Sequence, residues 1–281
     1  ITEDDRGTSL MPAIAMVWGK EGSKHTFGVS AFGISGFGVT FPEEANNPLS
    51  PNFNPMENSN PINYPQMARG FGHIESDYML LQVGLSYAYQ LTDKFSVGVQ
   101  PTINYSALEL EPNTTANPTM AGYPTTDKPS AIGFGAQFGM FYDSGNGLKL
   151  GASYKMPQTF FKFKFTNTYL DNSTSENEFQ MDYPGILSLG LGYSMGDIDF
   201  AFDFRRVDYE NTAGFKNTGW TQRGSVAGFG WKNISILSTG LQYKGINKLP
   251  LRVGYTYSSN PIPEEVTFFN IPATAVIKNA Y

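Results

Sequence analysis

Four cationic side chains lie within segments in which large apolar residues occupy every second position. An ammonium or guanidinium group can hold a carboxylate through charge-assisted hydrogen bonds, so these side chains could bind the head group of an amphipathic acid. Arg252 is the first candidate for this role and Arg205 is the second. In another interpretation, the cations form ion pairs with Asp199, Asp203 and Glu109 that maintain the shape of the protein. The four residues are Lys149, Lys155, Arg205 and Arg252.

No combination of side chains predicts catalysis or a bound cofactor. His25 lies beside a turn and His73 lies in a loop, and neither has a nucleophile motif or metal-ligand spacing around it. The sequence has no cysteine, which excludes disulfides and thiolate metal sites. Gly133, Gly135 and Gly139 lie inside an alternating segment, whereas a phosphate-binding loop needs a strand-to-helix turn. The sequence therefore predicts neither an enzyme nor a cofactor or metal site.

The segments that carry the cations are predicted to be β-strands. Between Met79 and Leu91, one set of alternate positions holds only Met, Leu, Val and Tyr, while the other set holds mostly small or polar residues. A helix would scatter both sets around its axis, so a period of two residues indicates a strand with two different faces. The same rule predicts about ten strands. They cover residues 9–18, 24–41, 77–91, 95–106, 132–142, 148–156, 187–193, 198–205, 237–243 and 251–257.

The predicted connections differ in length in a regular way. The short ones are rich in Gly, Asp, Asn and Lys, as tight hairpin turns are, and cover residues 20–23, 91–94, 143–147, 195–197 and 244–248. The long ones cover residues 42–76, 112–129, about 167–178 and 211–233. Short turns at one end and long loops at the other are typical of a transmembrane barrel. A soluble sandwich with Greek-key crossings has no reason to sort its loops in this way.

The composition agrees with such a barrel. The 281 residues have a mean hydropathy of -0.28 and contain no apolar run of the roughly 18 residues that a membrane helix needs. Barrel strands show lipid only every second residue, so a low mean hydropathy is expected. The net charge of -6, without a cluster of Lys and Arg, argues against nucleic acid as a partner. The prediction is an all-β, antiparallel, up-and-down transmembrane β-barrel of a bacterial outer membrane.

A membrane setting constrains the charged and aromatic side chains. A charge on the lipid face near mid-membrane costs about 2 to 4 kcal/mol, so the four cations are expected to face the interior. Aromatic residues at the strand ends are expected to form belts at the two interfaces. These residues are Trp18, Tyr87, Tyr89, Tyr142, Tyr154, Tyr193, Tyr243 and Tyr257.

The loop over residues 42–76 contains scattered apolar side chains among many Pro and Asn residues. They could form a small core that orders the loop, or an apolar surface that captures a ligand from the outside. The candidates for capture are Phe53, Met56, Tyr64 and Phe71.

Several segments match a known family in their order and motifs. Two predicted hairpins contribute to this match. One joins residues 11–18 to 26–39, and the other joins residues 87–91 to 95–99. The most specific segment is 251–263, LRVGYTYSSNPIP, in which an arginine-led strand runs into a Ser-x-Pro-x-Pro corner, with Ile271 and Pro272 shortly after. These features resemble the FadL/TodX (OmpP1) family of outer-membrane channels for long-chain fatty acids and hydrocarbons.

The resemblance implies a single barrel domain over residues 1–281 that is incomplete. If the family's count of about fourteen strands holds, the chain covers the second to the eleventh. A hatch that plugs the barrel would then precede Ile1, and about three strands would follow Tyr281. The resemblance further implies a monomer in contact with outer-membrane lipid and lipopolysaccharide.

The resemblance also implies passive transport of a hydrophobic ligand, such as a long-chain fatty acid, with lateral release into the bilayer. In the family, the third strand is kinked and opens a side door. The matching residues here are Gly33, Ser35 and Gly36, in a strand whose many glycines could instead serve only to let aromatic neighbours pack.

Three other functions are compatible with the fold. A structural or secretion-associated barrel would use the family fold as a scaffold for a partner. The short, polar loop over residues 112–129 favours this alternative, because it departs from the hydrophobic outer loops of fatty-acid channels. A general porin would have a wide, hydrophilic lumen, and an outer-membrane phospholipase would need a Ser and a His within mutual reach.

Overall fold

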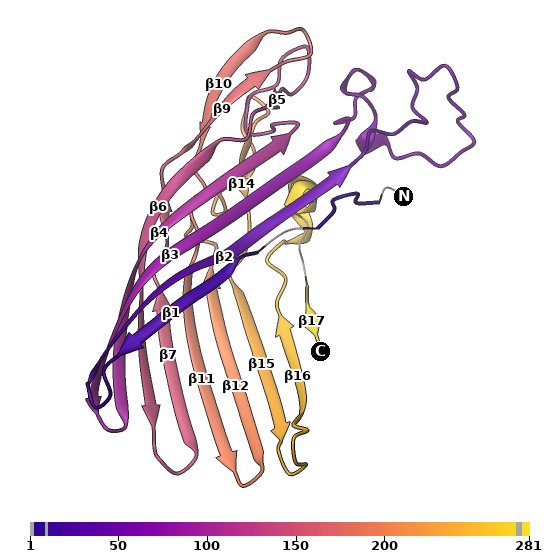
Figure 1. Ribbon diagram of the computed structural model, residues 1–281. Helices are drawn as coiled ribbons and strands as arrows, with labels where there is room; N and C mark the ends of the chain where they lie inside the picture. The colour runs from indigo at the N-terminus through magenta and orange to yellow at the C-terminus, as the bar shows by residue number, and fades with distance from the viewer. Residues whose placement is uncertain (1–2, 9–10, 274–276) are drawn as a thin grey trace.

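The computed structural model describes residues 3–8, 11–273 and 277–281. One antiparallel sheet of 12 strands dominates it, in the order β1-β2-β3-β4-β6-β7-β11-β12-β15-β16-β17, with β8 paired to β6 (Figure 1). Its ten long strands are β1 (Ala13–Gly19), β2 (His25–Phe41), β3 (Ile74–Thr92), β4 (Phe95–Glu111), β6 (Ser130–Asp143), β7 (Leu148–Lys155), β11 (Gly185–Met195), β12 (Ile198–Asp208), β15 (Ile234–Tyr243) and β16 (Leu251–Ser258). Two short strands, β8 (Thr159–Phe160) and β17 (Asn279–Ala280), complete it.

The sheet has the topology of an incomplete barrel. The long strands follow one another in chain order, each antiparallel to the next, and the sheet curves into a trough (Figure 1). The two outer strands of the sheet, β1 and β17, are not paired with each other, so the described part of the barrel is open. The predicted up-and-down, all-β fold with about ten strands is therefore confirmed. The first predicted strand begins later than expected, at Ala13, and Ser9 and Leu10 lie outside the described residues.

The two faces of the sheet differ as the alternation predicts. Side chains such as Leu85, 61% exposed, and Phe202, 40% exposed, point outward. On the inner face of β3 and β4, Gln82, Thr102 and Asn104 are at most 4% exposed. Large apolar side chains that water would penalise are exposed in rows along the strands, which is the arrangement that a lipid environment requires.

All the short turns lie at one end of the barrel and the long connections at the other (Figure 1). The first long loop ends at residue 73, directly before β3, and contains the 3-10 helices η1 (Pro61–Asn63) and η2 (Gln66–Ala68). A third 3-10 helix, η3 (Glu264–Ala273), follows β16. None of the described helices is long and apolar enough to cross a membrane.

The expected loop over residues 167–178 is wrong in its boundaries. The connection between β7 and β11 is longer and contains β9 (Phe163–Thr168) and β10 (Thr174–Phe179), which form a three-stranded sheet with β5 (Thr125–Thr126). The apolar alternation of β9 stops at Asn167, but the strand includes this residue. The buried Asn167 amide is tolerated because it forms hydrogen bonds with Asn113 and Asn177. A second small hairpin, β13 (Thr218–Trp220) with β14 (Val226–Phe229), lies in the loop before β15.

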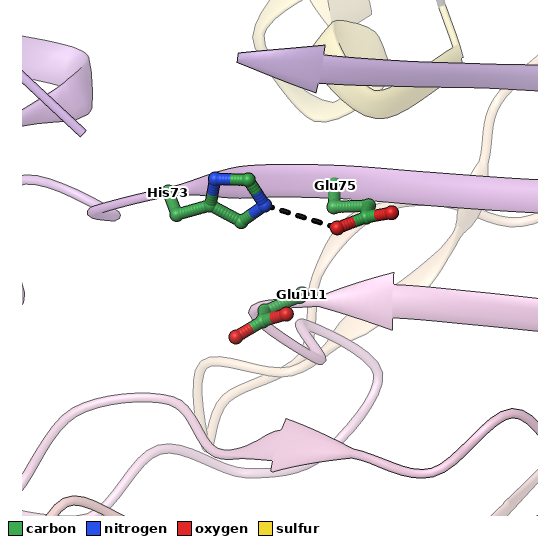
Figure 2. A group of neighbouring side chains, drawn as sticks. All are labelled: His73, Glu75 and Glu111. Atoms are coloured by element: carbon green, nitrogen blue, oxygen red, sulfur yellow. Dashed lines mark hydrogen bonds and ion pairs between the residues drawn. The ribbon is translucent and has the colours of Figure 1, made fainter. Parts of the chain in front are cut away.

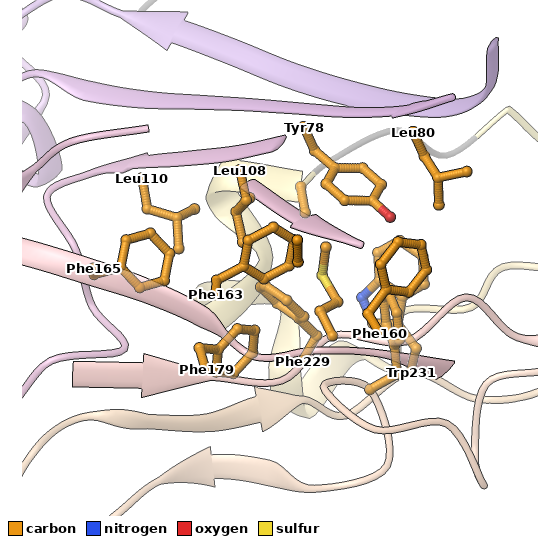
Figure 3. Packing of buried hydrophobic residues seen from close by; sticks show 14 of the residues in the cluster. Tyr78, Leu80, Leu108, Leu110, Phe160, Phe163, Phe165, Phe179, Phe229 and Trp231 are labelled. Carbon is orange, nitrogen blue, oxygen red and sulfur yellow. The ribbon is translucent and has the colours of Figure 1, made fainter. Parts of the chain in front are cut away.

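A cluster of buried apolar residues fills the interior beneath these outer loops (Figure 3). It joins Tyr78, Leu80 and Leu108 of the barrel wall to aromatic residues of β9, β10 and β14 and to Val266 of η3. Trp231 belongs to the cluster and donates a hydrogen bond from its indole nitrogen to Asn270 of η3 at 2.5 Å. Within the described residues, the outer part of the barrel is therefore filled with packed side chains.

The assignment of faces can be tested on two adjacent residues of β12. We expect Phe202→Arg to destabilise the full-length protein in lipid vesicles by about 2 to 4 kcal/mol, because it places a charge against the hydrocarbon. Ala201→Arg, which points inward, is the matched control and should cost clearly less. Urea unfolding measures both, and equal losses would contradict the assigned orientation of the sheet.

Candidate channel and ligand-binding site

A cavity of about 700 Å³ lies inside the barrel, against the inner faces of β6, β7, β11 and β12, and Ile34 of β2 and residues of β3 and β4 also line it. Small residues of β7 and β11, such as Ser153, Ser188 and Gly190, leave this space open. Lys155, Arg205 and Asp203 bring charges to its lining. The cavity is thus large enough for part of an extended organic molecule and has a charged region in its wall.

Lys155 and Arg205 reach this cavity because of the strand register. Arg205 is opposite Ser188 on β11, and Ser188 is opposite Ser153 on β7, two residues before Lys155. All these positions lie on the inner face. The Lys155 ammonium donates to Gln82 Oε1 at 3.1 Å and lies 5.5 Å from the centre of the Tyr183 ring.

Neither of these two cations is neutralised by a carboxylate within the described part of the chain. Asp203 lines the same cavity but makes no ion pair with them among the described residues. With two cations and one carboxylate, the lining of the cavity has a net positive charge, which attracts an anionic group. A carboxylate bound there could accept hydrogen bonds from both side chains.

The other two predicted cations lie elsewhere. Lys149 is near the turn that follows β6, with its ammonium 3.8 Å from the carboxylate of Asp143. Arg252 lies on β16, where its Nε donates to Gln242 Oε1, and it does not line the cavity. The structure therefore brings together two of the four residues, and the preferred candidate from the sequence, Arg252, is not one of them.

The acidic residues considered as ion-pair partners also have other neighbours. Asp199 pairs with Lys244 at 2.9 Å, and Glu109 is 3.4 Å from Lys128 in the outer loop. An ion-pair network that joins Asp199, Asp203 and Glu109 to the four cations is therefore absent from the described residues.

A buried polar network separates the cavity from the apolar cluster. The amide oxygen of Gln158 accepts hydrogen bonds from Gln82 at 3.4 Å, from Asn104 at 3.0 Å and from the Thr102 hydroxyl. The Lys155 ammonium joins the network through Gln82. Since buried polar groups are costly unless paired, these contacts hold the inner face of β3 and β4 in one arrangement. The sequence contains no signal for Gln158, because these partners come from two distant strands, β3 and β4.

Two glycines of β6 make room for this network. A Cβ atom at Gly135 would lie 2.3 Å from the Gln158 amide, and a Cβ atom at Gly133 would lie 2.7 Å from the Phe160 ring. Gly133 and Gly135, whose spacing does not indicate a phosphate site, therefore let the β8 segment pack against the inner face of the wall.

The strand β2 is irregular in its middle. Its register with β3 shifts between Gly33 and Ser35, so that Ile34 is an additional residue. Before the shift, Phe32 is opposite the inward Gln82, and after it Ser35 is opposite the inward Leu80. The inward positions therefore change from even to odd numbers, which is how a β-bulge redirects a strand.

A second cavity of about 540 Å³ adjoins this irregularity. The pairing of β1 with β2 ends at Phe32, so the edge of β2 beyond it has no partner strand in the described chain. Gly33, Ser35 and Gly36 line the cavity together with Met79 and Leu81, whose side chains point outward.

An apolar recess lies among the outer loops. Phe71 packs against Tyr123 and Phe268, with ring centres 5.9 and 5.7 Å apart, and lines the recess with Trp220 and Ile271. Of the four residues predicted for capture, only Phe71 lines it. Tyr64 and Phe53 are half-buried in the loop, whereas Met56 is 91% exposed. Trp220 and Phe268 come from distant loops and had no signal in the sequence.

Residues 54–275 match the family model described as outer membrane protein transport protein (OMPP1/FadL/TodX). The chain belongs to this family. Its place is therefore the outer membrane, and the family consists of transport proteins rather than enzymes, as the resemblance implied. No curated protein matches the sequence.

Solved structures of the family share the fold. A toluene transporter TodX from Pseudomonas putida is 19% identical, with a TM-score of 0.61 over 99% of this chain and 74% of that one. A TodX deltaS2S3 mutant is 16% identical, with a TM-score of 0.64 over 95% of this chain and 71% of that one. A FadL homologue from Pseudomonas aeruginosa is 14% identical, with a TM-score of 0.65 over 90% of this chain and 61% of that one.

The role of Gly135 can be tested by adding one methyl group. We expect Gly135→Ala to destabilise the full-length protein by about 1 to 3 kcal/mol, because the Cβ atom must displace Gln158 from its hydrogen bonds. Gly139→Ala is the control on the same face of β6, where a Cβ atom would lie 3.8 Å from its nearest neighbour. Denaturant unfolding compares the two, and equal stability would contradict the close packing of Gln158.

Proposed function

We propose that this protein is a passive channel that takes hydrophobic molecules with an anionic head group, such as long-chain fatty acids, through the outer membrane. The observation that carries the proposal is the pair of cations, Lys155 and Arg205, in an interior cavity without a carboxylate partner in the described chain. The transport family supports a channel, and the cation pair supports the class of ligand.

The proposed route begins at the apolar recess around Phe71 and continues past the apolar cluster into the cavity. An apolar chain would there contact small and apolar side chains, while its carboxylate accepts hydrogen bonds from Lys155 and Arg205. We propose lateral release at the β2 bulge, where Ile34 interrupts the regular alternation beside the second cavity. An exit into the bilayer spares an oily molecule the transfer into the aqueous periplasm.

A second candidate ligand is an uncharged aromatic hydrocarbon. It is favoured by the structural neighbours, which include a toluene transporter and CymD, a monoaromatic hydrocarbon channel. Such a ligand has no head group, so its uptake would not depend on the two cations. The packed outer part of the barrel is unfavourable for a general porin. A scaffold role would leave both kinds of ligand unbound.

The ligand class can be tested with charge-removing variants of the full-length protein. We expect Arg205→Gln and Lys155→Gln to weaken oleate binding on the order of tenfold each, because each removes a charge-assisted hydrogen bond of about 1.5 to 3 kcal/mol. Lys149→Gln is the control, since Lys149 lies outside the cavity beside Asp143. Titration of detergent-solubilised protein with labelled oleate measures the affinities.

Two outcomes would change the proposal. Undiminished oleate binding in both cavity variants would reject the cation pair as the head-group site. Binding of toluene but not of oleate would favour the hydrocarbon channel, and binding of neither would favour the scaffold.

Lateral release can be tested by removing the bulge. Deletion of Ile34 joins the outward Gly33 to the inward Ser35 and restores uninterrupted alternation on both sides. Since Ile34 also lines the first cavity, we expect this variant to bind oleate about as well as Ile34→Ala, which removes the same side chain, but to lose most oleate uptake by cells. Ile34→Ala keeps the additional residue and should retain uptake. Normal uptake in the deletion variant would reject a side exit at this position.

A further inference from the structure

Three possible metal ligands meet at the outer end of β3 and β4, away from the cation pair in the first cavity. His73 precedes β3, Glu75 lies at its start and Glu111 ends the neighbouring strand β4. Figure 2 shows the imidazole and the Glu75 carboxylate side by side, with the Glu111 carboxylate facing them from the next strand. One ligand atom from each residue lies within 4.8 Å of the other two, and all three side chains are half-buried.

The two glutamates oppose each other directly. Glu75 and Glu111 are register partners across β3 and β4, and like charges in this position destabilise a sheet. The imidazole Nε2 of His73 is 3.0 Å from Glu75 Oε2. No Lys or Arg of the described chain forms an ion pair with either glutamate. The carboxylates of Glu75 and Glu111 therefore form a site that favours a positive ion.

The neighbouring pair of residues on the same face provides an internal comparison. Asp77 and Glu109 are also directly opposite each other. There the repulsion is relieved within the protein, because the Lys128 ammonium contacts both carboxylates and Arg6 pairs with Asp77 at 3.0 Å. The same strands thus carry two acidic pairs, one neutralised by basic side chains and one with a histidine in their place.

The combination of one imidazole and two carboxylates indicates a class of ion. Calcium takes six to eight oxygen ligands, whereas zinc binds His nitrogen and Glu oxygen in sites of about four ligands. We propose that His73, Glu75 and Glu111 bind a divalent transition-metal ion, represented by Zn²⁺, with water in the remaining position. The bound ion would link the base of the loop over residues 42–73 to the end of β4.

Zinc binding by the full-length protein tests this proposal directly. The protein is purified in detergent with an affinity tag that contains no histidine, and Zn²⁺ is titrated in a calorimeter. We expect about one equivalent to bind, with affinity lowered at least about tenfold in both His73→Ala and Glu111→Gln. Zinc should also raise the melting temperature of the unsubstituted protein but not that of His73→Ala.

Two control variants locate the site. His25→Ala removes the other histidine, which lies at the opposite end of the barrel, and Glu109→Gln changes the neighbouring acidic pair. Both should bind zinc normally. Glu111→Gln also removes the like-charge repulsion, so it should fold even if the histidine variant does not.

Specific outcomes would overturn the assignment. They are an absence of saturable zinc binding, equal losses in the His25 and His73 variants, and calcium binding as tight as zinc binding that does not depend on His73. Oleate binding is measured on the same samples. None of the three metal ligands lines the first cavity, so failure of zinc binding and failure of oleate binding are distinguishable; Glu75 does line the second cavity, at the proposed exit.

Discussion

Side chains alternate between two environments along the antiparallel strands, and this alternation governs how the protein is built. In a bilayer every backbone polar group must find its partner within the protein, and a curved, hydrogen-bonded sheet achieves this while large apolar residues such as Leu85 face outward. The inner face is then free to carry polar and charged groups. An extra residue in the middle of a strand reverses the faces beyond it, which gives the additional Ile34 of β2 its structural importance.

The interior is divided along the barrel axis into regions of different chemistry. The outer part is packed by an apolar cluster that joins the barrel wall to the long loops. A buried polar network around Gln158 follows, and beyond it the cavity carries the charges of Lys155 and Arg205. The proposed ligand, with an apolar chain and an anionic head, would meet an environment of its own kind at each of these regions.

On the outward face of β3 and β4, the outer rim is organised by charged side chains. Acidic residues on β3 and β4 oppose each other in two successive pairs, and each pair requires a positive partner. Lys128 and Arg6 meet this need at Asp77 and Glu109, and they also tie an outer loop and the N-terminal segment to the wall. At Glu75 and Glu111 the proposed metal ion would have the same effect at the base of another loop.

Local alternation and short motifs were enough to predict the strands, their lipid-facing side, the sorting of turns and loops and the family. The folded arrangement of the chain was needed to see that Lys155 and Arg205 share a cavity while Lys149 and Arg252 do not, and that His73 meets Glu111. It also revealed β9 and β10, since the burial of Asn167 depends on amide partners from other segments. The reason is that cross-strand register and loop packing join residues distant in sequence, and local periodicity contains no information about such partners.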